Sequence, residues 1–209
     1  MKIYINPLTA NNIKVLLLCN LLEIDPEFQV VALNKGEQRS DKFLAISPEG
    51  QVPVLLDADL LLTESNAILQ YIAAKHQSNL WPSDFIEQAK VLRILFWQSS
   101  YFNSGVGAFA HRKIVMPFWG FGFNELDAEQ VTKYHKSVGA LEAMLKKNNF
   151  VTGNSISIAD ISLSAFFIFA SKAEMPLEQY PNTQVWLRNI SRQHWFIKTQ
   201  HHLEAFMSN

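Results

Sequence analysis

The sequence predicts a small α/β domain followed by an all-helical domain. Short apolar runs that suit strands alternate with helical patterns in residues 1–76, whereas every long segment from residue 85 onward has apolar residues at helical spacing. Residues 77–84 include Trp-Pro-Ser, which breaks both periodicities. A chain of 209 residues can form two modest domains. We therefore expect domains at 1–76 and 85–209, joined by a linker at 77–84.

The first domain begins with a strand, a helix and a second strand. Residues 3–5 suit a strand that Asn6-Pro7 ends, and residues 12–22 are apolar on most sides, which predicts a buried helix. Residues 30–33 form a short continuous apolar run, as expected for a strand of a covered parallel sheet. A strand, a helix and a strand in this order predict a right-handed crossover unit.

The rest of the first domain reads as a hairpin and a helix. Residues 54–56 and 60–62 are apolar and are separated by Asp57-Ala58-Asp59, which predicts an antiparallel hairpin. Residues 66–75 have the pattern of an amphipathic helix. This element order is that of a thioredoxin-like domain.

Three segments of the second domain predict helices. Residues 85–112 suit one long helix or two. Residues 127–147 are amphipathic, with an acidic first turn and Lys146-Lys147 at the end, which complements the helix dipole. Ser157 is followed three residues later by Asp160, a spacing that predicts a capping box rather than a catalytic carboxylate. The fold class is thus α/β plus all-α, the second domain being a helical bundle.

Charge and composition exclude several classes of function. With a formal net charge of -1, the chain has no excess of positive charge that would attract nucleic acid or an anionic membrane. A single cysteine excludes an internal disulfide and fits a reducing compartment. The start of the chain has no signal-peptide pattern, and no apolar run is long enough to cross a bilayer. We therefore expect a cytoplasmic protein without nucleic-acid or membrane partners.

Two segments together suit a clamp for the end of a peptide. Gly50-Gln51 supports a tight turn, and Pro53 pushes Val52 toward an extended conformation in which its backbone can pair with a ligand strand. Glu64-Ser65 then opens a helix, where free amides and a hydroxyl favour a carboxylate while Glu64 can receive an ammonium group. A carboxylate and an ammonium group on one carbon mark the end of an amino acid.

These two segments resemble the glutathione-binding half of the soluble glutathione transferases. The resemblance implies a cis valine–proline peptide that pairs with the cysteinyl part of glutathione, and a Glu-Ser pair that holds its γ-glutamyl end. Gln38 and Arg39 align with a polar pair that helps to hold the glycine carboxylate in phi-like relatives, and an ordinary solvated loop is an equal alternative for them. Gln51 neighbours the clamp and is the stronger candidate. The resemblance continues through the capping box near Asp160 and implies a homodimer. A large share of aromatic residues fits such an interface.

The turn after the first strand is the expected place for activation of the glutathione thiol, which is mostly protonated at neutral pH. Thr9 falls where theta-, delta- and phi-like transferases carry a catalytic serine, and Asn11 falls where some bacterial members place an asparagine near the sulfur. Beta-like members have a cysteine where this chain has Ala10, so the resemblance is to the bacterial theta-, phi- and nu-like classes. Both Thr9 and Asn11 are also ordinary helix caps, and that alternative stays open.

An apolar pocket for the second substrate is expected from the aromatic residues of the second domain. The candidates for its lining are Trp97, Tyr101, Phe102, Phe109 and Phe118. The six histidines lack the spacing of a zinc site, so glutathione is the expected co-substrate and no metal is expected.

The expected function is therefore conjugation of the glutathione thiolate to an electrophilic apolar compound, as in detoxification. Two alternatives remain: a glutathione-dependent disulfide reductase, and a binding or regulatory module that keeps the fold without turnover. An intact Glu64-Ser65 pair favours the enzymes, because a scaffold has no need of that charge arrangement.

Overall fold

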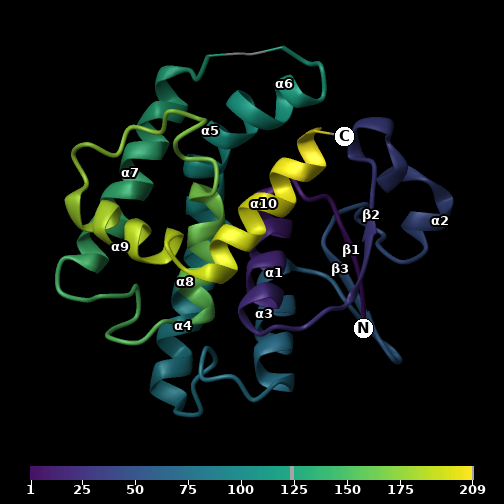
Figure 1. The fold of residues 1–209 in the computed structure, drawn as a ribbon, viewed down its shortest axis with the longest axis horizontal. Coiled ribbons are helices and arrows are strands. Elements are labelled where there is room, and N and C mark those ends of the chain that lie inside the picture. The colour runs from purple at the N-terminus through teal and green to yellow at the C-terminus, as the bar shows by residue number, and fades with distance from the viewer. Residues whose placement is uncertain (123–124, 209) are drawn as a thin grey trace.

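A four-stranded sheet with its helices lies on one side of the molecule and a bundle of helices on the other (Figure 1). The computed structural model describes residues 1–122 and 125–208, so residues 123, 124 and 209 of the expected second domain lie outside it. This arrangement confirms the predicted fold class, an α/β domain of thioredoxin-like order followed by a helical domain. No helix within the described residues is long and apolar enough to cross a membrane.

The sheet has the strand order β2-β1-β3-β4. The strands are β1 (Lys2–Ile5), β2 (Glu27–Val30), β3 (Val54–Asp57) and β4 (Leu60–Leu62). β1 pairs with β2 in parallel, and the β1–β3 and β3–β4 pairs are antiparallel. The predicted hairpin and the parallel pairing of the first two strands are therefore confirmed.

The second strand lies three residues earlier than the sequence predicts. The apolar run at residues 30–33 contributes only Val30 to β2, and Leu33–Lys35 is a turn of 3₁₀ helix. β2 is an edge strand whose side chains are mostly exposed, so it needs no apolar run. Val31 is buried because it packs with Phe43 and Val54 below the sheet.

Each face of the sheet is covered by helices of the first domain. α2 (Asp41–Leu44) covers one face, where Tyr4 packs edge-on against Phe43. α1 (Ala10–Leu21) and α3 (Ser65–Lys75) cover the other face, and α1 also contacts the helical domain through α8 and α10. Because α1 is enclosed from both sides, eight consecutive residues, Asn12 to Cys19, are buried.

The helical domain starts with one long helical path that runs from residue 85 to residue 118. It comprises α4 (Phe85–Trp97), a π-helical stretch (Gln98–Gly107), α5 (Ala108–Ala110), a second π-helical stretch (His111–Val115) and α6 (Met116–Phe118). α7 (Ala128–Leu145) packs against the first π-helical stretch. Gly105 permits this close approach, because a Cβ there would lie 2.7 Å from the carbonyl oxygen of Lys133.

The remaining helices are α8 (Ile158–Ser164), α9 (Pro181–Ser191) and α10 (His194–Ser208), and a 3₁₀ turn (Ala165–Phe167) extends α8. α10 crosses α1 in Figure 1, and the two helices are joined by a 2.8 Å hydrogen bond from Asn20 Nδ2 to Thr199 Oγ1. The carboxylate of Glu142 accepts hydrogen bonds from the backbone amides of Asn182 and Thr183, and so α7 caps α9. These bonds outweigh partial burial and lower the pKa of Glu142.

The predicted capping box at Ser157 and Asp160 is confirmed. Asp160 is fully buried and accepts hydrogen bonds from the Ser157 amide and hydroxyl, the Val151 amide and the indole of Trp186, at 3.0 to 3.1 Å. Burial raises the pKa of Asp160, and these bonds oppose the rise. Because Asp160 accepts four hydrogen bonds from its own fold, we assign it a structural rather than a catalytic role.

The two domains are also joined by a buried polar network around Lys14. The Lys14 ammonium, which is fully buried, donates to Asn66 Oδ1 at 2.9 Å and to Gln98 Oε1 at 2.7 Å. The Ser162 hydroxyl donates to the same two oxygens. Burial lowers the pKa of Lys14 well below its usual value, although Glu64 acts in the opposite direction. The network therefore links α1 and α3 to α8 and the long helical path.

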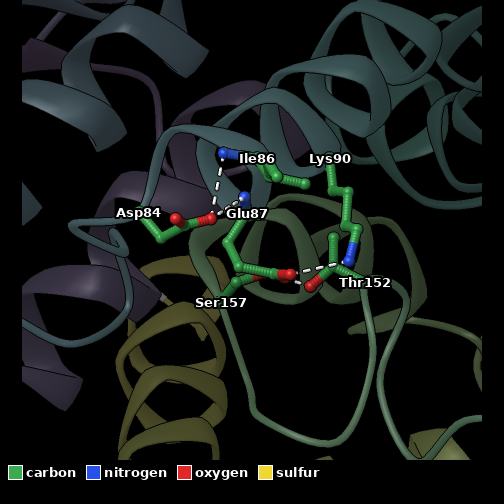
Figure 2. A network of polar contacts seen from close by, with 6 residues as sticks. All are labelled: Asp84, Ile86, Glu87, Lys90, Thr152 and Ser157. Carbon is green, nitrogen blue, oxygen red and sulfur yellow. Dashed lines mark hydrogen bonds and ion pairs between the residues drawn. The ribbon is translucent and has the colours of Figure 1, made fainter.

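A cavity of about 790 Å³ lies between the segment joining α3 to α4 and the loop at 152–157. Figure 2 shows its polar contacts: Asp84 caps α4 through the amides of Ile86 and Glu87, and Glu87 pairs with Lys90 at 2.6 Å. Both carboxylates already have partners. The cavity shares no lining residue with the predicted clamp, so the site lies elsewhere.

Candidate functional site

The clamp loop is held in a defined turn by Ser47. The Gln51 amide donates to Ser47 Oγ at 3.2 Å, and the Ser47 hydroxyl donates to the carbonyl oxygen of Gln51 at 3.0 Å. Gly50 has a φ of +62°, which favours glycine. The Val52–Pro53 peptide bond is cis, as the resemblance implies. The loop thus presents Gln51 and Val52 beside the start of α3.

The start of α3 contains a strained residue. Glu64 has a φ of +64° and a ψ of +108°, a conformation that costs a side chain other than glycine roughly 1–3 kcal/mol. This backbone leaves the Glu64 side chain exposed while Ser65, the first residue of α3, is buried. Strain of this kind persists where the surroundings fix it and is typical of ligand sites.

These two segments and α1 enclose a cavity of about 90 Å³. It contains six of the predicted residues, namely Asn11, Gln51, Val52, Pro53, Glu64 and Ser65, together with Ser47, Glu49 and Thr63. The N-terminal end of α3 supplies partial positive charge to it, and Glu64 supplies negative charge. The arrangement is therefore able to hold both charged groups of an amino-acid terminus.

Gln38 and Arg39 lie behind the clamp loop rather than in the cavity. Arg39 Nη1 donates to the carbonyl oxygen of Glu49 at 3.1 Å. A Cβ at Gly50 would lie 2.7 Å from the carbonyl oxygen of Gln38, so the two backbones are in close contact. Gln38 Oε1 is buried and has no hydrogen-bond partner among the described residues. In this structure the pair buttresses the turn that carries Gln51 and Val52.

Thr9 lies at the N-terminal end of α1, where its side chain makes no capping hydrogen bond. Its hydroxyl oxygen instead accepts a hydrogen bond from Asn12 Nδ2. Because that bond occupies a lone pair of Thr9, the hydroxyl hydrogen stays available to a ligand. The Thr9 side chain is therefore not a simple helix cap in this structure.

Asn12 is fully buried and connects three parts of the site. Its Oδ1 accepts from the Asn6 amide at 3.2 Å, and its Nδ2 also reaches the carbonyl oxygen of Val52 at 3.4 Å. Asn6 is held in turn by the bond from its Nδ2 to the carbonyl oxygen of Val31 at 3.0 Å. Asn12 thus ties the end of β1, the Thr9 hydroxyl and the clamp loop into one unit.

A second cavity, about 400 Å³, lies on the other side of Thr9 and Asn11. Asn11 lines both cavities, and Thr9 lines only this one. The other residues come from the turn before α1, the long helical path and α7: Leu8, Ala10, Asn103, Ser104, Gly107, Ala108, Ala110, His111, Arg112, Val115 and Gln130. A thiol held between the cavities at Asn11 would face a second reactant here.

The predicted aromatic lining of this cavity is not found. Phe102 and Phe109 are buried in the core, where Phe102 meets Phe166 and Phe109 meets Tyr134. Trp97 packs on Phe102. Tyr101 and Phe118 are largely exposed, and neither lines the cavity. Small and polar residues take their place, because the turns of the long helix that face Thr9 carry Asn103, Gly107, Ala108 and His111.

Sequence reasoning missed Asn12 in the site and Lys14 in the network between the domains. A lysine between Ile13 and Val15 in an otherwise apolar helix was a visible signal of a buried charge. Asn12 carried no such signal, because an asparagine near a helix start usually reads as a cap.

Comparison with known proteins shows which proteins this chain resembles. Residues 1–74 match the family model described as the glutathione S-transferase N-terminal domain, and residues 124–189 match that of the C-terminal domain. Glutathione S-transferase F10 of Arabidopsis thaliana is 31% identical over 173 residues, which cover 79% of this chain and 80% of that protein. The crystal structure of glutathione transferase F7 of Populus trichocarpa superposes with a TM-score of 0.84 at 28% identity, covering 96% of this chain and 97% of that one.

Some relatives are longer than this chain. It spans 29% and 35% of the length of glutathione S-transferases T2 and T3 of Arabidopsis thaliana, which are 29% and 28% identical to it over the matched residues. The likeness to these two proteins therefore concerns only part of each.

Proposed function

Because this chain belongs to the glutathione S-transferase family, we propose that it binds glutathione in the 90 Å³ cavity and transfers the thiolate to an electrophile in the 400 Å³ cavity. The observation that carries this proposal is the placement of Asn11. It lines both cavities, beside Thr9, between a site suited to a peptide terminus and a site with room for a second reactant.

Each part of glutathione has a matching group. The Glu64 carboxylate receives the γ-glutamyl ammonium, and the Ser65 hydroxyl with the first amides of α3 receives the carboxylate. The backbone of Val52 pairs with the cysteinyl unit as an added strand. Gln51 and Arg39 lie on the side of the glycine carboxylate, Gln51 in the cavity and Arg39 behind the loop beside Gln38.

In the reaction, the Thr9 hydroxyl donates a hydrogen bond to the glutathione sulfur and favours its thiolate form. The thiolate attacks the electrophilic carbon, a C–S bond forms, and the leaving group departs with the electron pair of its bond. Cys19 takes no part, because burial raises the pKa of its thiol to about 12 and it stays protonated.

Replacing Ser65 tests the binding site. Ser65→Ala removes a hydroxyl from the carboxylate position, a charge-assisted contact worth roughly 1.5–3 kcal/mol. Calorimetry should show glutathione binding weakened by at least tenfold. Ser83→Ala, in an exposed position that lines neither cavity of the site, is the matched control and should bind like the wild type. Similar affinity in all three proteins would make Ser65 only a part of the helix start and would remove the basis of this proposal.

We also propose that the protein is a homodimer. The long helical path exposes aromatic side chains, and Phe85, Phe96 and Tyr101 are the most exposed of them, at 84%, 70% and 64% in the single chain. Aromatic side chains of this kind are enriched at interfaces. Light scattering at micromolar concentration should give about twice the chain mass of 23.8 kDa. A mass of 23.8 kDa under these conditions would contradict the proposal.

A cytoplasmic location and a role in the removal of electrophiles complete the proposal. The chain has one cysteine, and it is buried, which suits a reducing compartment. Reduction of a disulfide by two glutathiones is the alternative reaction. Asn11 is compatible with it, because Asn11 lines both cavities. Assays with an aryl chloride and with 2-hydroxyethyl disulfide separate the two reactions.

A further inference from the structure

The 400 Å³ cavity beside Thr9 has none of the aromatic residues that the sequence predicts for the second-substrate pocket. Most of its lining surface is apolar, but seven of its thirteen lining residues have polar side chains, and one of these is a fixed positive charge, the guanidinium of Arg112. None of its described lining residues is an aspartate or a glutamate. A concave site with an unopposed cation favours an anionic ligand.

Arg112 is held in place and keeps most of its donors. Its Nη1 donates to the carbonyl oxygen of Glu125 at 2.8 Å, which uses one of five N–H groups. The neighbouring Lys113 pairs with Glu174 at 2.9 Å, whereas Arg112 makes no ion pair among the described residues. A carboxylate in the cavity would therefore meet a positioned guanidinium that pairs with no carboxylate of the described residues.

A further cavity, smaller than the one beside Thr9, is also lined by His111 and Arg112. It measures about 250 Å³ and is lined by His111, Arg112, Met116 and Gly122. Partial desolvation of the ring and the charge of Arg112 lower the pKa of His111, which favours the neutral imidazole, and a neutral imidazole can donate one hydrogen bond. The ring stacks edge-on against Trp119. His111 and Arg112 line both this cavity and the 400 Å³ cavity, so an anionic group of a reactant in either cavity could reach them.

We propose that the electrophile bears a carboxylate, which Arg112 binds with His111 beside it, while the reacting carbon lies near Thr9 and Asn11. This inference rests on the proposed function. With an aryl chloride, the glutathione thiolate attacks the ring carbon that carries chlorine, the C–S bond forms, and chloride leaves with its electron pair. The carboxylate takes no part in the bond changes and serves only for binding and orientation.

The test compares two substrates that differ in one charge, 4-chloro-3,5-dinitrobenzoate and its methyl ester. The ratio of kcat/KM for the acid to kcat/KM for the ester should fall at least tenfold in Arg112→Gln. Lys113→Gln removes the same charge one residue away, from a position outside both cavities, and should leave the ratio unchanged. An equal loss for acid and ester, or no loss for either, overturns the inference, since Arg112 then does not recognise the carboxylate.

A binding measurement keeps the inference separate from the proposed function. S-(4-carboxybenzyl)glutathione should bind the wild type more tightly than S-benzylglutathione, and Arg112→Gln should abolish the difference. If neither chloride reacts and this difference is present, the proposed activity fails and the carboxylate site stands. If both compounds bind the wild type equally, the carboxylate site is wrong even when the ester is conjugated.

Discussion

Thr9→Ala should raise the pKa of the thiol of bound glutathione and lower conjugation at neutral pH by about 10²–10³-fold, while glutathione affinity stays nearly unchanged. The substitution removes a hydroxyl that lines the reaction cavity and has its hydrogen available, because the oxygen already accepts from Asn12. A donor of this kind stabilises the charge that develops on sulfur. Titration of thiolate absorbance across pH, with kcat/KM measured alongside, checks the result.

Thr9→Ser is the matched control, since it keeps the hydroxyl and should keep much of the activity. Made alone, Asn12→Ala should raise the pKa of the bound thiol by part of the amount seen in Thr9→Ala. Made together with Thr9→Ala, it should raise that pKa no further, because Asn12 acts as a positioning residue through Thr9. If Asn11→Ala raises the thiol pKa and Thr9→Ala does not, Asn11 is the donor. If neither changes it, backbone amides at the start of α1 hold the thiolate and the assignment of Thr9 fails.

Asp160→Ala should destabilise the fold by about 3–5 kcal/mol, because it leaves several buried donors without a partner. The donors that lose their acceptor are the amides of Val151 and Ser157, the Ser157 hydroxyl and the Trp186 indole. Urea denaturation followed by tryptophan fluorescence measures the change. Asp127→Ala removes the acid of a second capping box, which is exposed, and should cost only about 1 kcal/mol. Equal losses from the two substitutions would show that burial of Asp160 adds nothing.

Local chemistry explains which parts of the fold and site are readable from the sequence. The capping box at Ser157, the acidic start of the helix after Asp127, and the clamp residues Val52 and Ser65 are set by neighbours within a few positions. Such features depend on hydrogen bonds and backbone preferences that short segments carry with them. The start and end of β2 depend instead on its place at the sheet edge, which no short segment encodes.

The lining of the reaction cavity was not readable for a similar reason. Phe102, Phe109 and the lining residues Asn103 and Ala108 belong to one helical path, so their order along the chain is compatible with either face pointing inward. The long helical path packs against α7 and the 3₁₀ turn after α8, and this packing determines which of its faces points inward. The rings of Phe102 and Phe109 therefore lie in the core. The two hydrogen-bond partners of Lys14, Asn66 and Gln98, lie 52 and 84 positions along the chain, a distance that sequence patterns do not connect.

The Lys14 network sets a condition on recombining this protein with its relatives. Its members are divided between the domains, with Lys14 and Asn66 in the first and Gln98 and Ser162 in the second. A chimera that grafts residues 1–76 onto a helical domain without a glutamine at the position of Gln98 would enclose the Lys14 amine without that acceptor. Recombination of the two halves therefore succeeds best where the helical domain supplies equivalents of Gln98 and Ser162.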